Sequence, residues 1–416
     1  MINRAAGIRV LYSFAMKLGG PRICATAWHQ VTGLAAAGAD VIVFPGVAPW
    51  PLPDNVICQP TLSRGCIRIP YRALGRLRAY ALHDYIVSQR LESLSGKIDI
   101  IHAWPLGSLR TLRAAARLGI PTVLERPNAY TKFAMEIVER ECKSLGIRMP
   151  TAHEHAYNPE VIRIEEEEYR AAGRLLCPSD FVVRTFVEHG FTADKLIRHQ
   201  YGFDDTIYHP AEDWDGHKPG LTMLFAGGCT PRKGLHYALQ AWLRSPAHQD
   251  GTFLIAGAFI PGYAEILSAM LSHPSVKVLG HRADIPELMR KSDILVLPTI
   301  EEGSALVTME ARGSGCVLLV SEASGAICKH GQDALVHRVG DVAALTNHIA
   351  MLHENRALLE ELRATSLKTV HEITWRAAGV KLLEAYRESI EAYSRECLRS
   401  APDGSRVQHS TASQSA

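Results

Sequence analysis

The sequence predicts an α/β protein made of two doubly wound domains that face each other across a cleft. Short apolar runs alternate with helical patterns along the chain, which is typical of parallel sheets connected by crossover helices. The same pattern begins again in the second half, after a segment at residues 201–220 in which Gly, Pro and Asp accumulate. With 416 residues, of which 47% are hydrophobic and 21% charged, the chain can form two cores of ordinary size.

Ten apolar runs are predicted to be strands. They are nearly continuous in apolar residues, as expected for strands of a sheet that is covered on both faces. Helical patterns lie between them, for example at residues 25–37 and 108–118. We place the first domain at residues 1–210 and the second at residues 211–380. The predicted strands are residues 8–14, 40–46, 99–104, 121–126 and 174–179 in the first domain, and 221–228, 251–258, 276–280, 293–299 and 316–322 in the second.

Composition excludes several classes of protein. The formal net charge of +2 gives no indication of a nucleic-acid partner, and no stretch approaches the roughly 20 apolar residues of a membrane span. The nine cysteines are scattered and show no C-x-x-C pair, which fits free thiols in a reducing cytosol better than disulfides or a zinc site. The first residues read as a strand rather than a signal peptide, and residues 400–416 are predicted to be disordered. We therefore expect a cytoplasmic protein without a resident metal.

The most informative stretch is TIEEGSALVTMEARGSG at residues 299–315, which follows a predicted strand. A helix is predicted over residues 304–313, after a small loop. The first turn of such a helix offers free backbone N–H groups and a partial positive charge to an anion, so a phosphate is the expected ligand. The residues assigned to this turn are Gly303, Ser304, Ala305 and Leu306.

Glu302 and Glu310 flank the same turn, and because they would repel a phosphate, they are expected to face other parts of the ligand. They are eight positions apart, at most about 12 Å along an ideal helix axis. The paired carboxylates of a glycosidase stand only about 5 to 9.5 Å apart around one bond. The wider spacing suits two hydroxyl-bearing rings with a diphosphate between them, which is the layout of a nucleotide sugar. The alternative is two ordinary acids, one on a solvated helix and one near a helix N-terminus.

Two adjacent cations, Arg232 and Lys233, occupy a strand-to-helix turn in the sequence GGCTPRKG. Cations at such a turn place positive charge where a leaving diphosphate would lie. The turn is not a P-loop, because no Ser or Thr follows the lysine. Gly227 and Gly228, at the start of the turn, are assigned to the same ligand. The alternative is that Arg232 and Lys233 are plain surface cations.

With these motifs in place, the chain resembles glycosyltransferase family 4, whose members are retaining enzymes with the GT-B fold of two Rossmann-like domains. The most specific match is the motif of two acids separated by seven residues, here Glu302 and Glu310. The resemblance implies that Glu302 contacts the donor sugar, Glu310 the ribose hydroxyls and Lys233 the diphosphate. It also implies that the helix at residues 381–399 packs back on the first domain.

The sequence departs from the family pattern in two places. Gly228 stands where the family commonly has an arginine, so that Arg232 is the candidate replacement. Where the family often has a sugar-contacting histidine in the first domain, this chain offers Arg126 or Tyr130.

Three further residues have weaker signals. Gly20, after the first strand, belongs either to a donor-facing loop or to a plain turn. His281, directly after the strand at residues 276–280, is assigned to the donor site. His102, at the end of another strand, is either a satisfied core histidine or a functional one.

One basic stretch points to an acceptor or a membrane. Residues 64–90 carry six arginines against one acid, Asp84, with apolar residues at helical spacing. Such a stretch suits peripheral contact with an anionic bilayer or with a lipid-diphosphate acceptor. A solvated helix is the alternative interpretation.

The sequence therefore predicts a retaining glycosyltransferase that moves a hexose from a nucleotide-diphosphate sugar to a hydroxyl of a glycan or lipid-linked acceptor. We expect no metal and no cofactor, and a place in bacterial-type surface polysaccharide or glycolipid biosynthesis. Location in the cytoplasm, with or without contact to the inner face of the membrane, fits this role. Two alternatives stay open: a GT-B sugar-nucleotide epimerase, and a degenerate sugar-nucleotide binding protein suggested by Gly228.

Overall fold

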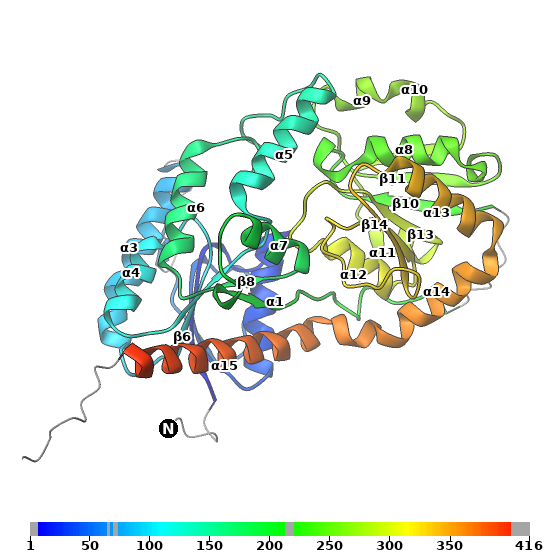
Figure 1. Ribbon diagram of the computed structural model, residues 1–416. Helices are drawn as coiled ribbons and strands as arrows, with labels where there is room; N and C mark the ends of the chain where they lie inside the picture. Colours follow the sequence, from blue (N-terminus) through cyan, green and yellow to red (C-terminus); the bar gives the residue numbers. More distant parts are fainter. Residues whose placement is uncertain (1–6, 65–66, 70–73, 213–219, 401–416) are drawn as a thin grey trace, which may run out of the picture.

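The computed structural model describes residues 7–64, 67–69, 74–212 and 220–400. Two parallel sheets with flanking helices lie side by side, and a long C-terminal helix runs from the second half back beneath the first (Figure 1). The predicted two-domain α/β architecture is thereby confirmed. The predicted disordered tail lies, from residue 401 onward, outside the described residues.

The first sheet is entirely parallel, in the order β3-β2-β1-β6-β7-β8-β9. All five strands predicted for this half are present, shifted by no more than a few residues. β3 and β9 were not predicted, because three residues at a sheet edge are too short to form a recognisable apolar run. The strands are β1 (Arg9–Lys17), β2 (Asp40–Val47), β3 (Val56–Cys58), β6 (Ile100–Ala103), β7 (Thr122–Glu125), β8 (Arg174–Cys177) and β9 (Leu196–Arg198).

The second sheet is also parallel, in the order β12-β11-β10-β13-β14-β15. All five predicted strands are again present, and the edge strand β15 is the addition. The strands are β10 (Thr222–Ala226), β11 (Thr252–Ala256), β12 (Val276–Gly280), β13 (Ile294–Leu297), β14 (Val317–Ser321) and β15 (Ala334–His337). A short antiparallel pair, β4 (Ser63–Arg64) and β5 (Ile67–Arg68), lies outside both sheets.

The helices predicted at residues 25–37 and 108–118 are present within two residues of those bounds, whereas the C-terminal helix predicted at residues 381–399 begins earlier, at Trp375. The helix predicted over residues 304–313 begins two residues later, at Leu306, and ends as predicted at Gly313. The helices are α1 (Ile23–Ala36), α3 (Arg76–Leu94), α4 (Leu109–Arg117), α5 (Thr131–Ser144), α6 (Pro159–Ala171), α7 (Asp180–Glu188), α8 (Leu235–Arg244), α9 (Tyr263–Ile266), α10 (Ser268–Leu271), α11 (Ile285–Arg290), α12 (Leu306–Gly313), α13 (Val342–Glu354), α14 (Arg356–Thr369) and α15 (Trp375–Ser400). Within the described ranges, none of these helices is both long and apolar enough to cross a bilayer.

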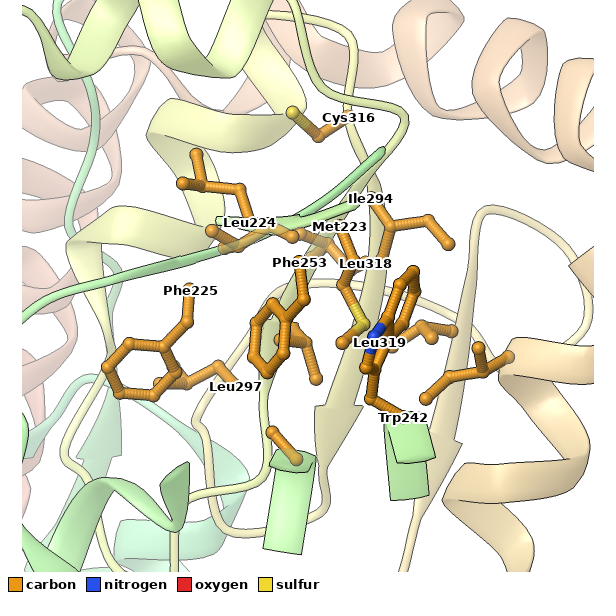
Figure 2. Packing of buried hydrophobic residues seen from close by; sticks show 14 of the residues in the cluster. Met223, Leu224, Phe225, Trp242, Phe253, Ile294, Leu297, Cys316, Leu318 and Leu319 are labelled. Atoms are coloured by element: carbon orange, nitrogen blue, oxygen red, sulfur yellow. The ribbon is translucent and has the colours of Figure 1, made fainter. Parts of the chain in front are cut away.

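The core of the second domain lies between its sheet and the covering helices. Figure 2 shows Trp242 of α8 packed against Phe253 of β11 and Leu319 of β14. These side chains are fully buried, so truncating one of the leucines to Ala would cost about 2 to 5 kcal/mol. Cys316 is buried in the same core, and every described cysteine is a free thiol, as predicted.

The long helix α15 belongs to the core of the first domain. Leu382 and Tyr386 pack there with the first sheet, and the helix lies so close to α1 that a Cβ on Gly379 would come within 2.7 Å of the backbone of Gly33. The Tyr386 hydroxyl lies 2.6 Å from Nδ1 of the fully buried His102. Nε2 lies 3.4 Å from Glu125 Oε2 without a hydrogen bond, and His102 does not line the cavity between the domains, so the structure favours the interpretation of a core histidine.

Candidate active site

A cavity of about 510 Å³ lies between the two domains. On the first-domain side its walls are the end of β1, the segments after β1, β6 and β7, the start of α3 and the segment that leads into α6. On the second-domain side they are the segments after β10 and β13. In open α/β sheets, ligands bind at this edge. Lining residues of the first domain include Met16, Trp104 and Arg126, and those of the second include Gly227 and Ser304.

The acidic and basic loops predicted from the sequence meet in this cavity. Arg232 Nη2 lies 3.0 Å from Glu302 Oε1, and Lys233 Nζ contacts the same oxygen. Gly234 makes this approach possible, because its φ is 70° and a Cβ there would lie 2.0 Å from the carbonyl oxygen of Pro298. Three residues predicted as catalytic are thus in direct contact.

The charges in this cluster reinforce one another. Burial alone would raise the pKa of Glu302, but Arg232 and Lys233 outweigh that effect, so the pKa lies below its usual value. Burial lowers the pKa of Lys233 despite its contact with Glu302. An entering anion would compete with an ionised Glu302 for the two cations.

Glu301 is a further member of the site that the sequence did not single out. Its side chain is fully buried; Oε1 accepts a hydrogen bond from Ala129 N at 3.1 Å, and Oε2 lies 3.2 Å from Arg232 Nη1. Arg232 Nη1 also donates to the Glu301 carbonyl oxygen at 2.8 Å. Burial raises the pKa of Glu301. The sequence signal that points to Glu301 is a pair of adjacent acids, Glu301 and Glu302, opposite a pair of adjacent cations. Through its contacts with Arg232 and Ala129, Glu301 links the loop that carries the cations to the first domain.

The N-terminus of α12 opens on the cavity without a side-chain cap. Ser304, Ala305 and Leu306 line the cavity there, and Ser304 Oγ is buried with no hydrogen-bond partner among the described residues. Ala305 N donates to the Ser324 carbonyl oxygen at 3.1 Å, whereas the N–H groups of Leu306 and Val307 have no backbone acceptor among the described residues and therefore favour an anion. Backbone and hydroxyl donors therefore lie on the same wall as the two cations.

The N-terminus of α4 shows the contrast. Asp84 accepts hydrogen bonds from the backbone N–H groups of Arg110 and Thr111, and Glu168 accepts from those of Leu106 and Ser108. The protein's own carboxylates thus occupy this helix start. Asp84, the single acid of the basic stretch, has a structural role.

Some of the predicted donor residues lie outside the cavity wall. Glu310 is half-buried on the last turn of α12, where Tyr208 donates a hydrogen bond to it, and burial raises its pKa to about 7. Gly303 packs against the first domain, since a Cβ there would lie 1.7 Å from the carbonyl oxygen of Pro127. Gly20 lies in the β1–α1 loop, and His281 is exposed after the edge strand β12; neither lines the cavity.

On the first-domain side, Arg126 lines the cavity and Tyr130 does not. Arg126 Nη2 donates to Thr131 Oγ1 at 3.0 Å and to Glu165 Oε2 at 2.9 Å. The Tyr130 hydroxyl instead donates to Glu166. Of the two candidates for a first-domain contact, Arg126 is therefore the one placed at the site.

Family models cover most of the chain in two consecutive matches. The model described as Glycosyltransferase Family 4 matches residues 25–205, and the model described as Glycosyl transferases group 1 matches residues 220–355. The chain belongs to glycosyltransferase family 4. The two matches correspond to the two sheets of this glycosyltransferase.

Relatives agree with this assignment, and solved structures agree with the fold. The D-inositol 3-phosphate glycosyltransferase of Rhodococcus opacus is 24% identical over 83% of this chain and 78% of its own length. An Escherichia coli UDP-Gal:α-D-GlcNAc-diphosphoundecaprenol α-1,3-galactosyltransferase is 31% identical over 20% of this chain and 21% of its own length. Anabaena HepE in complex with UDP superposes with a TM-score of 0.61 at 16% identity, covering 91% of this chain and 99% of that one. Sucrose-phosphate synthase from Thermosynechococcus elongatus superposes with a TM-score of 0.63 at 16% identity, covering 93% of this chain and 100% of that one. This glycosyltransferase has the GT-B fold.

Proposed function

We propose that this glycosyltransferase moves a hexose from a nucleotide-diphosphate sugar to an acceptor hydroxyl with retained configuration. The observation that carries the proposal is the second-domain wall of the cavity, where Arg232, Lys233 and the uncapped start of α12 lie together. Two cations and a helix N-terminus suit a diphosphate. Glu302, in contact with both cations, lies next to the expected position of the sugar.

In the proposed reaction, the bond between the sugar C1 and the β-phosphate oxygen breaks, and the nucleoside diphosphate leaves with the electron pair. The acceptor hydroxyl oxygen bonds to C1 from the same face, and its proton passes to the departing phosphate oxygen. Lys233, Arg232 and the first turn of α12 stabilise the growing negative charge. Arg232 is buried and the Lys233 side chain is only 16% exposed, so water screens these charges poorly and the effect is strengthened.

The comparisons suggest which substrates to test first. Two of the structural neighbours were solved as Anabaena HepE with UDP and with UDP-glucose, and one relative is named for UDP-Gal and a diphosphoundecaprenol-linked acceptor. We therefore propose a uridine-diphosphate sugar as donor and a glycan or lipid-linked acceptor, in surface polysaccharide or glycolipid biosynthesis. No metal or cofactor enters this proposal.

Incubation with a panel of UDP-sugars, followed by quantification of released UDP, tests the function. We expect one donor to give slow UDP release without acceptor, with the freed sugar first appearing in the donor's anomeric configuration by NMR. An isomerised sugar still attached to UDP would instead identify an epimerase. Binding of UDP without release from any donor or acceptor mixture would indicate the degenerate binding protein.

The raised pKa of Glu310 predicts a pH dependence of donor binding. If the ribose hydroxyls donate to its carboxylate, the donor favours the ionised form and lowers the pKa from about 7. Affinity for UDP-glucose should then rise as pH increases toward about 7 and level off above it. Calorimetry between pH 5.5 and 8 measures this, with Glu310→Gln as the non-titrating control. A pH profile that Glu310→Gln leaves unchanged would remove Glu310 from the donor site.

The basic stretch remains a proposed membrane contact. On α3, the described arginines Arg76 and Arg78 are exposed, and Tyr85 is 49% exposed, so the predicted apolar stripe is not the buried face of the helix. Arg72, also assigned to this surface, lies outside the described residues. Figure 1 places α3 on the outer side of the first domain.

At about 1 kcal/mol for each arginine, replacing Arg76 and Arg78 by Gln should weaken binding to anionic vesicles about 30-fold at physiological salt. The loss should shrink as salt rises, since the attraction is screened over about 8 Å. Co-sedimentation with anionic and neutral vesicles measures both effects. Equal and salt-independent binding by wild type and variant would mean that this helix face is only solvated surface.

A further inference from the structure

We propose that the first-domain wall of the cavity binds an anionic group of the acceptor, a phosphate or diphosphate ester, through Arg22, Arg76 and Arg126. The inference rests on the proposed function, because it assigns the second substrate of the same cavity. It concerns the wall opposite the one assigned to the donor diphosphate.

Free positive charge in the cavity lies on the first-domain side. In the second domain, Arg232 and Lys233 face Glu302, and Arg232 also faces Glu301. Arg22 and Arg76 line the cavity with exposed side chains, and neither makes an ion pair or side-chain hydrogen bond with another described residue.

The acids of that wall do not neutralise these two arginines. Glu154 forms no ion pair with either arginine among the described residues; its Oε1 lies 3.7 Å from Nε2 of His155, whose pKa is lowered by burial. Glu165 accepts hydrogen bonds from Arg126, Thr131 and Tyr169. The wall thus keeps a surplus of positive charge that would attract an anionic substrate.

Arg126 contributes unused hydrogen-bond donors. Its side chain is almost completely buried, and only Nη2 is paired, with Thr131 and Glu165. Nε and Nη1 have no hydrogen-bond partner among the described residues, although the guanidinium stacks 4.3 Å above the Tyr169 ring. Buried polar atoms are rarely left unpaired, and a guanidinium presents paired donors to phosphate oxygens. An oxyanion entering from the cavity would satisfy them after a small shift of the side chain.

Backbone strain points to the same wall. Arg22, with a φ of 61°, and Leu106, with a φ of 68°, are the non-glycine residues with positive φ in the described part of the chain. Both line the cavity, on the first-domain side. Such conformations are unfavourable for side chains other than glycine and gather at ligand sites. The strained start of α1 therefore holds Arg22 at the cavity.

Calorimetry with glucose 1-phosphate, in the presence of saturating UDP, tests the proposal. Saturating UDP fills the donor site, so that a phosphate binding event reports on the other wall. We expect wild type to bind glucose 1-phosphate and the double variant Arg22→Gln/Arg76→Gln to bind it at least about tenfold more weakly, with UDP affinity unchanged. Arg78→Gln is the matched control, since Arg78 is exposed on the same helix but does not line the cavity. Methyl glucoside, which has no phosphate, should bind wild type and variant alike.

Arg126→Gln extends the test, with thermal unfolding recorded because its partner Glu165 is buried. The double variant carries the test by itself if Arg126→Gln fails to fold, because both of its arginines are exposed. A folded Arg126→Gln protein should also lose affinity for glucose 1-phosphate about tenfold.

Several results would overturn the assignment. If glucose 1-phosphate bound neither wild type nor the double variant, or bound both equally, the assignment of an anion site to this wall would be wrong. If the double variant lost affinity for both UDP and glucose 1-phosphate, these arginines would bind the donor diphosphate instead. Preference of wild type for UDP-glucuronic acid over UDP-glucose, lost in the variant, would place the anion on the donor sugar. Absence of UDP binding by wild type contradicts the proposed function instead, whereas arginine-dependent phosphate binding without UDP would still support the anion site.

Discussion

Replacing Lys233 by Ala is expected to lower turnover of the donor at least about a hundredfold, comparable to removing one preorganised electrostatic donor from an active site. The Lys233 ammonium lies in the inter-domain cavity, where it contacts Glu302. The fold should survive, because Arg232 Nη2 still pairs with Glu302 at 3.0 Å. Initial rates of UDP release measure the loss, and thermal unfolding checks the fold. Lys291→Ala is the control, since Lys291 forms an exposed ion pair with Glu287 on the same domain.

A folded Lys233→Ala enzyme with normal turnover would exclude the leaving-group role. Arg232→Ala then asks whether Arg232 replaces the arginine that the family commonly has at position 228. A Cβ on Gly228 would meet only Thr230 Cγ2, at 3.9 Å, so a side chain fits there. We expect Gly228→Arg to restore part of the turnover that Arg232→Ala removes. If Gly228→Arg restored none of that turnover, Arg232 would have a different role.

Replacing Glu310 by Ala is expected to weaken donor affinity by about 1.5 to 3 kcal/mol, or about tenfold to about 150-fold, because the ribose hydroxyls lose a charged acceptor. In the structure, the Tyr208 hydroxyl donates a hydrogen bond to this carboxylate. Tyr208→Phe is therefore the matched control: it removes the hydroxyl but keeps the carboxylate, and should bind UDP at least as tightly as wild type. Calorimetry with UDP distinguishes the two variants. If Glu310→Ala bound UDP as tightly as wild type, Glu310 would lie outside the donor site.

The fold followed from the sequence because each central strand is a continuous apolar run bounded by turn residues. Such a run identifies a strand buried on both faces wherever it is long enough to recognise, as for β13 with its four fully buried residues. The edge strands β3, β9 and β15 are short, and each includes a partly exposed residue, so no continuous buried run marks them and their pairing depends on neighbours distant in the sequence. Local pattern does not contain that information.

The site followed from the sequence only in part, for a similar reason. Glu302, Arg232 and Lys233 could be predicted to meet, because strand ends of one parallel sheet share an edge. Glu301 could not, since its role depends on Arg232 and on the backbone of Ala129 in the other domain. His281 does not line the cavity, because it follows β12 at the edge of the sheet, away from the central strands whose ends form the cavity wall.

The crystal structure of the protein with UDP tests the central claim most directly. The account predicts the β-phosphate within hydrogen-bond distance of Lys233 Nζ or the Arg232 guanidinium and of the first turn of α12, with the ribose hydroxyls at Glu310. It also predicts that Glu302 releases at least one of its two cations relative to the contacts described above. UDP bound elsewhere, or a diphosphate that contacts neither cation nor the start of α12 while Glu302 keeps both partners, would contradict it.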